Sequence, residues 1–223
     1  MSFFQQLQKQ TESARATLLS APIIVKSLQG NISLDEYVAF LTQAYHHVKH
    51  TVSLLMAVGA RLPQEKEWLR EAVAEYIEEE IGHQEWILND IECCGFDKEA
   101  ARKSTPNVAT ELMVAYAYDM VNRVNPLGFF GMVQVLEGTS VAIAEQAADR
   151  IRSSLELPKE AFSYLYSHGS LDQQHLQFFE NLMNRIGQPE EQRVIIHSAK
   201  VFYQLYGNIF RSLTTAPADL AAA

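Results

Sequence analysis

The segment YLYSHGSLDQQHLQFFE, residues 164–180, places two imidazoles and one carboxylate at the spacing H-x3-D-x2-H. At about 100° per residue, His168, Asp172 and His175 fall within about 60° of one another, so a continuous helix would present all three on one face. Histidine together with a carboxylate is a usual ligand set for iron, manganese or zinc. The segment therefore predicts a metal site, with an ordinary surface His–Asp pair as the alternative.

A second set of such residues lies in EYIEEEIGHQEW, where Glu80 and His83 are three residues apart. Helical bundles that bind two iron or two manganese ions project a Glu-x-x-His pair of this kind toward their interior. The run Glu78-Glu79-Glu80 is equally typical of a solvated acidic helix face. The pair therefore indicates either metal ligands or surface charge.

Glu137 is a single carboxylate within FFGMVQVLEGTSVAIA, where its neighbours are apolar or small. Burying a carboxylate is costly unless it is paired or bound to a metal. The residue therefore predicts a metal ligand. The alternative is a carboxylate that accepts its hydrogen bonds from Arg or Tyr side chains.

Histidines also gather in AYHHVKHTVSLL, where His46 and His50 share one predicted helix face and His47 is expected to point elsewhere. Packed aromatic rings or surface imidazoles are the alternative interpretation. Six of the seven histidines lie in these four segments, which belong to four different predicted helices. Because a bundle interior brings side chains from several helices together, we predict a carboxylate–histidine metal site there.

The elements that must position these residues are predicted to be helices almost throughout. Ser33 and Glu36 form a capping box that opens a helix running through about Ala60. Pro63 opens the next helix, which is expected to continue to Gly95. This interpretation places the Glu-x-x-His pair on one uninterrupted helix.

Proline, glycine and capping residues predict the other helix ends. Helices are expected after Asp97, from Asn107 to just before Pro126, from Pro126 to Leu155, from Pro158 to Gly187 with a break near Gly169-Ser170, and from Pro189 to about Thr214. The predicted fold class is all-α, a compact bundle of seven to nine helices with short connections. We expect a single domain over residues 1–213 and a frayed tail over residues 214–223.

The composition narrows the class of protein further. The chain has 223 residues with 48% hydrophobic and 20% charged side chains, a soluble globular balance that can bury a substantial core. Its formal net charge of −9 argues against nucleic acid as a partner, because phosphate contacts need clustered Lys and Arg. The two cysteines, Cys93 and Cys94, are adjacent, so no disulfide framework is expected.

The N-terminal segment MSFFQQLQKQTESARATLLSA is polar and amphipathic. It lacks the basic start and apolar core of a signal peptide. No apolar run is expected to reach the ~20 residues that span a bilayer. We therefore expect a cytoplasmic protein without a membrane partner.

Taken together, these segments resemble the heme-oxygenase-like superfamily, by helix order, over roughly residues 10–212. That superfamily includes the TenA-like thiaminases, the pyrroloquinoline-quinone synthases and the heme-oxygenase-like di-iron oxidases. The motif formed by His168, Asp172 and His175 resembles the last ligand motif of the di-iron oxidases.

The other candidate ligands also have counterparts in the di-iron oxidases. Glu137 falls where that family has a mid-chain glutamate ligand, and Glu80 and His83 resemble the ligand pair of its second long helix. His46 falls where members carry a first-helix ligand, which is often a glutamate. A histidine at this position departs from the family pattern, so this assignment rests on position alone.

The resemblance implies a non-heme di-iron oxidase or oxygenase that activates O2. Its substrate would be a small organic molecule, such as a fatty acid, an amino acid or a related metabolite. The resemblance also implies two Fe(II) ions per chain, with manganese as the alternative metal, an electron donor as a further partner, and a homodimer. The implied metal ligands are His46, Glu80, His83, Glu137, His168, Asp172 and His175, of which Glu137 and Asp172 are also the implied catalytic residues.

Two sister functions of the superfamily fit these residues less well. The thiaminases use a cysteine nucleophile in the region around Glu137, which here reads VLEGTSVA and has no cysteine. A heme oxygenase would use an axial histidine in YHHVKH but would leave Glu80, His83, Asp172 and His175 without a role. The alternative function is therefore a heme-oxygenase-like or TenA-like small-molecule-binding protein that has no di-iron site.

Aromatic and basic side chains complete the expected site. Aromatic residues at helical spacing would either line a pocket or form plain core, and the candidates are Tyr45, Tyr116, Phe130, Tyr164 and Phe178. The basic side chains considered as anchors for a substrate carboxylate are Lys49, Arg123 and Arg150.

Overall fold

The computed structural model describes the backbone of residues 1–213 and the side chains of residues 1–167 and 176–213. Within the described backbone every regular element is helical, as the sequence predicts. The α-helices are α1 (Phe3–Leu19), α2 (Pro22–Gln29), α3 (Leu34–Val48), α4 (Thr51–Arg61), α5 (Glu67–Glu80), α6 (His83–Cys93), α7 (Lys98–Lys103), α8 (Val108–Asp119), α9 (Phe129–Leu155), α10 (Ser163–Asn184) and α11 (Pro189–Ser212). Short 3-10 or π turns join some of them. The set exceeds the seven to nine helices expected from sequence.

Several helices begin where local sequence signals predict. The Ser33 hydroxyl accepts a hydrogen bond from the Glu36 backbone N–H, and the Glu36 carboxylate accepts one from the Ser33 N–H, so the capping box is confirmed. The Asn107 side chain caps α8 by accepting from the Thr110 N–H. Pro189 is the first residue of α11. Each of these residues acts on the backbone N–H groups of the first turn of its own helix, or, for proline, lacks one there. The sequence alone therefore locates these helix starts.

Both long helices expected in the first half of the chain are interrupted, which corrects the sequence interpretation. Helices α3 and α4 replace the first, and α5 and α6 replace the second. The second interruption lies between Glu80 and His83, where Gly82 adopts a left-handed φ of +95°. The Glu-x-x-His pair is therefore split between two helices. In contrast, α10 is continuous through Gly169-Ser170, where a break was expected.

Replacing Gly82 by alanine is expected to lower the free energy of unfolding by about 1 to 2 kcal/mol. A Cβ atom at this position would meet no atom within 4 Å, so the cost would come from the left-handed backbone alone. Gly82→Asn is the matched variant, because asparagine tolerates that conformation better than alanine. Urea unfolding of both variants measures the difference, and equal losses would contradict a backbone origin.

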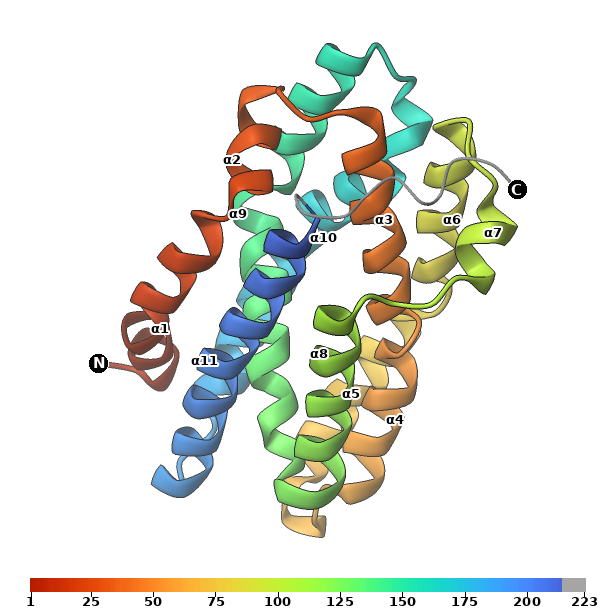
Figure 1. The fold of residues 1–223 in the computed structure, drawn as a ribbon. Helices are drawn as coiled ribbons and strands as arrows, with labels where there is room; N and C mark the ends of the chain where they lie inside the picture. The colour runs from red at the N-terminus through yellow and green to blue at the C-terminus, as the bar shows by residue number, and fades with distance from the viewer. Residues whose placement is uncertain (214–223) are drawn as a thin grey trace.

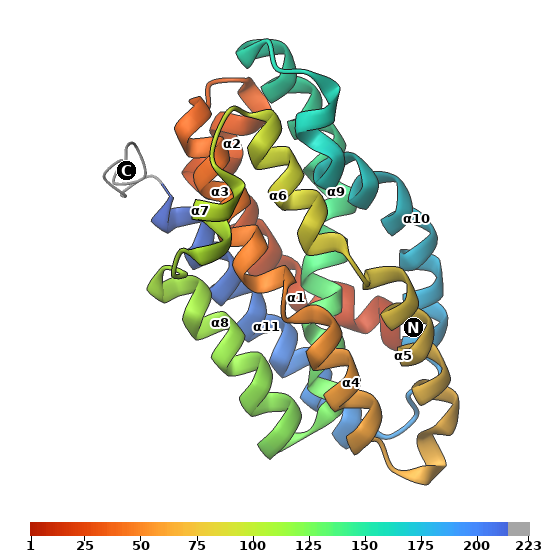
Figure 2. The same ribbon diagram turned by 90° about the vertical axis from the view of Figure 1, so that its right-hand side faces the viewer.

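Helix α9 runs the length of the bundle and forms its centre, packed against α10, α11 and α2 (Figures 1 and 2). It crosses α11 at very close range, since a Cβ atom added to Gly131 would lie 2.5 Å from the Ala199 backbone nitrogen. The Ser198 hydroxyl on α11 also donates to the Gly128 carbonyl at 2.7 Å. A glycine is therefore required where the two helices meet, and this contact fixes their relative setting.

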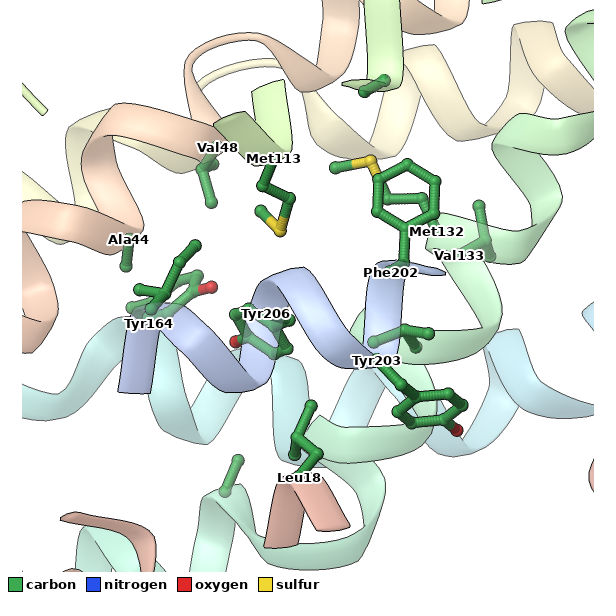
Figure 3. Packing of buried hydrophobic residues seen from close by; sticks show 14 of the residues in the cluster. Leu18, Ala44, Val48, Met113, Met132, Val133, Tyr164, Phe202, Tyr203 and Tyr206 are labelled. Carbon is green, nitrogen blue, oxygen red and sulfur yellow. The ribbon is translucent and has the colours of Figure 1, made fainter. Parts of the chain in front are cut away.

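Apolar side chains from many helices form one continuous core. Figure 3 shows part of it, where side chains of α3, α8, α9 and α11 meet, among them Val48, Met113, Met132 and Phe202. Helix α1 packs against α11, so the first and the last described helices lie side by side (Figure 1). This arrangement buries the apolar stripe of each surface helix.

One helical stretch within the described residues, Pro126–Leu155, is long and apolar enough to cross a membrane. The sequence expectation of no such run is corrected here. Of the apolar window in this stretch, 61% is buried inside the bundle. The helix is thus a buried core helix of a soluble helical fold.

The start of α10 is held by a side chain from another helix. Its own N-cap residue, Phe162, supplies no side-chain hydrogen bond. Instead the fully buried Asp90 of α6 accepts from the Ser163 N–H at 3.0 Å, from the Ser163 hydroxyl, and from the Tyr164 N–H at 2.9 Å. Asp90 therefore supplies the acceptors that a helix N-terminus needs and fixes α10 against α6.

Candidate metal centre

A cavity lies where α3, α4, α5, α9, α10 and α11 meet, with about 620 Å³ of space including its mouth. Two carboxylates, Glu80 and Glu137, and one imidazole, His47, line it. We call it the carboxylate cavity. Its other lining residues are Val48, Thr51, Leu55, Tyr76, Phe129, Met132, Val133, Leu136, Ser140, Tyr164 and Tyr206. The site therefore combines a few metal-binding groups with a mostly apolar and aromatic wall, which is usual for ligand sites.

Glu137 reaches the carboxylate cavity from the middle of α9. Met132, Val133 and Leu136 from the same helix line the cavity beside it. The apolar run that singled out Glu137 in the sequence is therefore the wall of this cavity. A carboxylate in such surroundings is costly to keep charged unless a cation or hydrogen-bond donors face it.

Glu80 is the last residue of α5, and its carboxylate lies 3.2 Å from Nδ1 of His83, the first residue of α6. The His83 side chain is 3% exposed and its ring stacks on Trp86 with centroids 4.0 Å apart. The structure therefore brings the predicted pair together, although the two residues lie on either side of a helix break. Glu80 lines the carboxylate cavity, whereas His83 does not line it and contacts Glu80 instead.

His47 lines the carboxylate cavity, whereas His46 and His50 do not, so His47 faces a different side from them, as expected. The residue is buried, and its ring packs edge-to-face on Tyr206 of α11 with centroids 5.7 Å apart. Sequence reasoning missed His47 as a functional residue. All of residues 44–48 are buried, so this end of α3 has no exposed polar face from which the orientation of the helix could be inferred. The sequence therefore does not indicate which of the two adjacent histidines faces the cavity.

His46 is directed to the other side of α3, away from the carboxylate cavity. Its Nε2 shares a hydrogen bond of 2.8 Å with the Ser104 hydroxyl, and its Nδ1 lies 3.1 Å from the Lys49 ammonium. Because the ammonium can only donate, Nδ1 accepts and Nε2 carries the proton. Both ring nitrogens are therefore engaged in a hydrogen-bond chain outside the cavity.

The environment of His46 keeps its imidazole neutral. Burial, with added repulsion from Lys49 and His50, lowers the pKa of His46 from 6.5 to about 4. In the unfolded chain the imidazole takes up a proton below about pH 6.5, whereas in the folded protein it does so only near pH 4. The stability that follows from this difference is therefore present above pH 6.5 and is lost as the pH falls toward 4.

We expect the free energy of unfolding of the metal-free protein to fall by about 1 to 2 kcal/mol between pH 7 and pH 5 through His46. Urea unfolding at the two pH values measures the change. His46→Asn, which cannot titrate, should remove this part of the pH dependence. An unchanged dependence in the variant would assign the loss to other groups.

His168, Asp172 and His175 lie outside the residues whose side chains the structure describes. The backbone of α10 is described and is continuous on both sides of them. Tyr164 lines the carboxylate cavity, and the ring of Phe178 lies 5.5 Å from that of the cavity residue Tyr76. On one side of the segment a side chain of α10 therefore lines the cavity, and on the other side Phe178 contacts a residue that lines it.

The donor chemistry of the carboxylate cavity fits iron, since imidazole nitrogen and carboxylate oxygen are its usual protein ligands. Among the described side chains, however, no three His, Cys, Asp or Glu residues gather closely enough to hold a metal ion by themselves. His47, Glu80 and Glu137 line the same cavity without forming such a cluster. A complete ligand set would therefore need donors from residues 168–175.

The basic residues considered as carboxylate anchors lie elsewhere. Lys49 contacts His46 and the ring of Tyr45, and Arg123 pairs with Asp119 on the surface. Within the described part of the chain, the carboxylate cavity is lined by neither Lys nor Arg. Of the predicted pocket aromatics, Tyr164 lines the cavity. The cavity is thus acidic, with no protein cation on its described wall.

Solved structures define the class of fold. The chain is similar to a domain of unknown function with a heme oxygenase-like fold from Shewanella denitrificans, at a TM-score of 0.86 and 22% identity over 100% of this chain and 99% of that one. It is also similar to a TenA homologue from Pseudomonas syringae, at a TM-score of 0.80 and 11% identity over 96% of this chain and 93% of that one. A heme oxygenase from Leptospira interrogans matches at a TM-score of 0.76 and 16% identity over 95% of this chain and 100% of that one. These likenesses confirm the all-α heme-oxygenase-like fold.

The family follows from the sequence itself. A family model described as "Iron-containing redox enzyme" matches residues 38–207, so the chain belongs to this family. The match covers all of the residues that line the carboxylate cavity. No curated protein matches the chain.

Proposed function

We propose that this protein is a non-heme oxidase or oxygenase that activates O2 on two Fe(II) ions held in the carboxylate cavity and oxidises a small organic substrate. The observation that carries the proposal is the meeting of His47, Glu80 and Glu137 from three helices at one cavity. The membership of the chain in an iron-containing redox family supports iron as the metal. A cytoplasmic homodimer served by an electron donor is part of the proposal.

Several described residues in or next to the cavity have a task in this proposal. The His83 imidazole, 3.2 Å from the Glu80 carboxylate, orients it, as partners of metal ligands commonly do. Tyr206 holds the His47 ring by its edge. Bound iron would supply the electrons that reduce O2. Leu136 and its apolar neighbours on α9 exclude water from the oxidation.

We assign the remaining iron donors to His168, Asp172 and His175 on α10. These positions follow Tyr164 by four, eight and eleven residues on a continuous helix, so they share its register. Tyr164 itself lines the carboxylate cavity. A continuous α10 with Tyr164 at the cavity is therefore compatible with His168, Asp172 and His175 on the same helix face.

Anaerobic titration of metal-free protein with Fe(II), followed by mixing with O2 and visible spectroscopy, tests the proposal. We expect about two iron ions per chain and a transient absorbance after O2 is added. Absence of tight iron binding would overturn the proposal. Heme titration would then decide whether the cavity belongs to a heme-binding or other small-molecule-binding protein of this fold.

His47→Ala is expected to weaken Fe(II) binding by at least about tenfold, because it removes an imidazole from the cavity wall. His46→Ala is the matched control, since its side chain contacts Ser104 and Lys49 instead. The same titration measures both affinities. If His46→Ala weakened Fe(II) binding and His47→Ala did not, His46 would be the iron ligand, as the resemblance implies, and His47 would not.

A further inference from the structure

The two tryptophans of the chain lie in different surroundings. Trp68 of α5 packs against the hydrophobic core, and Cζ of Arg185 lies 4.0 Å from its ring centroid. Trp86 of α6 is half-buried, but it is not among the described residues that pack against that core. Burial of apolar surface in the core therefore accounts for Trp68 and does not account for Trp86.

Trp86 stacks on the imidazole of His83, which lies three residues before it on α6. The two ring centroids are 4.0 Å apart and the ring planes differ by 30°, so the rings are in close contact. Nδ1 of the same imidazole lies 3.2 Å from the carboxylate of Glu80, which lines the carboxylate cavity. Trp86, His83 and Glu80 therefore form an unbroken chain of contacts, which we call the tryptophan relay.

The tryptophan relay leads from the carboxylate cavity toward the surface of the molecule. Its middle member, His83, is buried, whereas Trp86 is accessible to solvent on part of its ring. Helix α6, which carries both residues, lies on the outer side of the bundle beside α3 and α10 (Figure 2). The relay thus has one end at the proposed iron site and the other end in contact with water.

Oxidising equivalents that find no substrate are a hazard to the wall of the carboxylate cavity. Tyr76, Tyr164 and Tyr206 line it, and a site able to oxidise a C–H bond of a substrate is also able to oxidise a phenol. An enzyme that activates O2 must therefore limit such side reactions. Indole loses an electron readily, so a tryptophan that reaches solvent offers a route for electrons from outside.

We propose that Trp86 is a redox-active residue that passes electrons from a small reductant in solution to the iron site when no substrate is bound. The inference rests on the proposed function and names the point where its electron donor acts. Reduction of one O2 to two waters takes four electrons and four protons. The two Fe(II) ions supply two of these electrons, and Trp86 supplies the other two, one at a time.

Each transfer through Trp86 balances in electrons and protons. The indole loses one electron to the iron site by way of His83 and Glu80, and its N–H proton passes to water, which leaves a neutral tryptophan radical. Ascorbate, a reductant of the required class, then returns one electron and one proton and becomes the ascorbyl radical. Without substrate the protein therefore acts as an ascorbate-dependent O2 reductase.

Electron paramagnetic resonance of Fe(II)-loaded protein, frozen shortly after mixing with O2 and without substrate, tests the inference. We expect an organic radical whose spectrum changes when the protein contains ring-deuterated tryptophan, and added oxygen at Trp86 in peptide mass spectra. Ascorbate should suppress both signals. A radical whose spectrum responds to ring-deuterated tyrosine instead would place the electron loss on a phenol of the cavity wall and overturn the inference.

Trp86→Phe keeps an aromatic ring beside His83 but removes the group that is oxidised. We expect it to lose the radical and to consume O2 with ascorbate about ten- to a hundredfold more slowly. Trp86→Tyr should restore part of the rate and give a phenoxyl radical, because a phenol also loses an electron and a proton. Trp68→Phe is the matched control and should behave like the wild type. Equal rates in the two phenylalanine variants would overturn the inference.

Fe(II) titration of the same preparations separates this inference from the proposed function. Trp86 does not line the carboxylate cavity, so the three variants should bind iron as the wild type does. If iron binds and reacts with O2 but no tryptophan radical forms, the tryptophan relay is wrong and the di-iron proposal stands. If iron does not bind, both are wrong.

Discussion

Replacing Glu137 by alanine is expected to remove most of the rise in melting temperature that we expect Fe(II) to give the wild-type protein. A ligand that binds only the folded state at a hundred times its dissociation constant stabilises that state by about 2.7 kcal/mol. For a chain of this size such a gain corresponds to roughly 5–11 °C. Glu137 lines the cavity where we propose the iron binds, so its loss should remove most of the shift.

Anaerobic thermal unfolding with and without Fe(II) measures this effect in three proteins. Glu145→Ala is the matched control, because Glu145 is an exposed carboxylate on the same helix. Equal shifts in all three proteins would place the iron elsewhere.

Replacing Asp90 by alanine is expected to lower the free energy of unfolding by about 3 to 5 kcal/mol. The change removes the acceptor for Ser163 N–H, Ser163 hydroxyl and Tyr164 N–H, and it leaves the Ser163 donors half-buried and the Tyr164 N–H buried. Burial raises the pKa of the Asp90 carboxyl, and the three hydrogen bonds oppose that rise by favouring its charged form. The start of α10 would therefore lose its anchor on α6.

Asp97→Ala provides the comparison for Asp90. Asp97 caps α7 by accepting from the Glu99 N–H, but it is exposed, so its loss should cost only about 1 kcal/mol. Urea unfolding of the two variants gives both values. If Asp90→Ala cost no more than Asp97→Ala, its three hydrogen bonds would not hold α10 in place.

The sequence predicts the all-helical class and many helix ends because these depend on neighbouring residues. The Ser33 capping box, the Asn107 cap and the proline that opens α11 each act within one turn. Amphipathic periodicity then specifies which faces pack. These properties do not require knowledge of the rest of the chain.

The interruptions of the two long helices are not predictable in the same way. The break after α5 depends on a left-handed Gly82, but an isolated glycine in a helical pattern is usually tolerated. The packing of α5 on α4 and of α6 on α3 decides that the chain must change direction there. Such a requirement is tertiary and leaves only a weak signal in the local sequence.

The candidate site was predictable where one residue stood out from its surroundings. Glu137 within an apolar run and Glu80 beside His83 have this property, and both carboxylates line the carboxylate cavity. To choose between His46 and His47 one must know how α3 is oriented about its own axis. The sequence pattern does not indicate this orientation, because residues on every side of this end of the helix are buried.

The packing of α1 against α11 bears on when the nascent chain could bind the iron that we propose. Roughly 170 residues separate the end of α1 from the start of α11, so a ribosome needs about 10 to 35 s to make the intervening chain. During that time Leu7 and Leu18 of α1 lack the partner that covers them in the folded bundle. Tyr206, which lines the carboxylate cavity, also emerges only with α11. Metal loading is therefore expected to follow translation rather than accompany it.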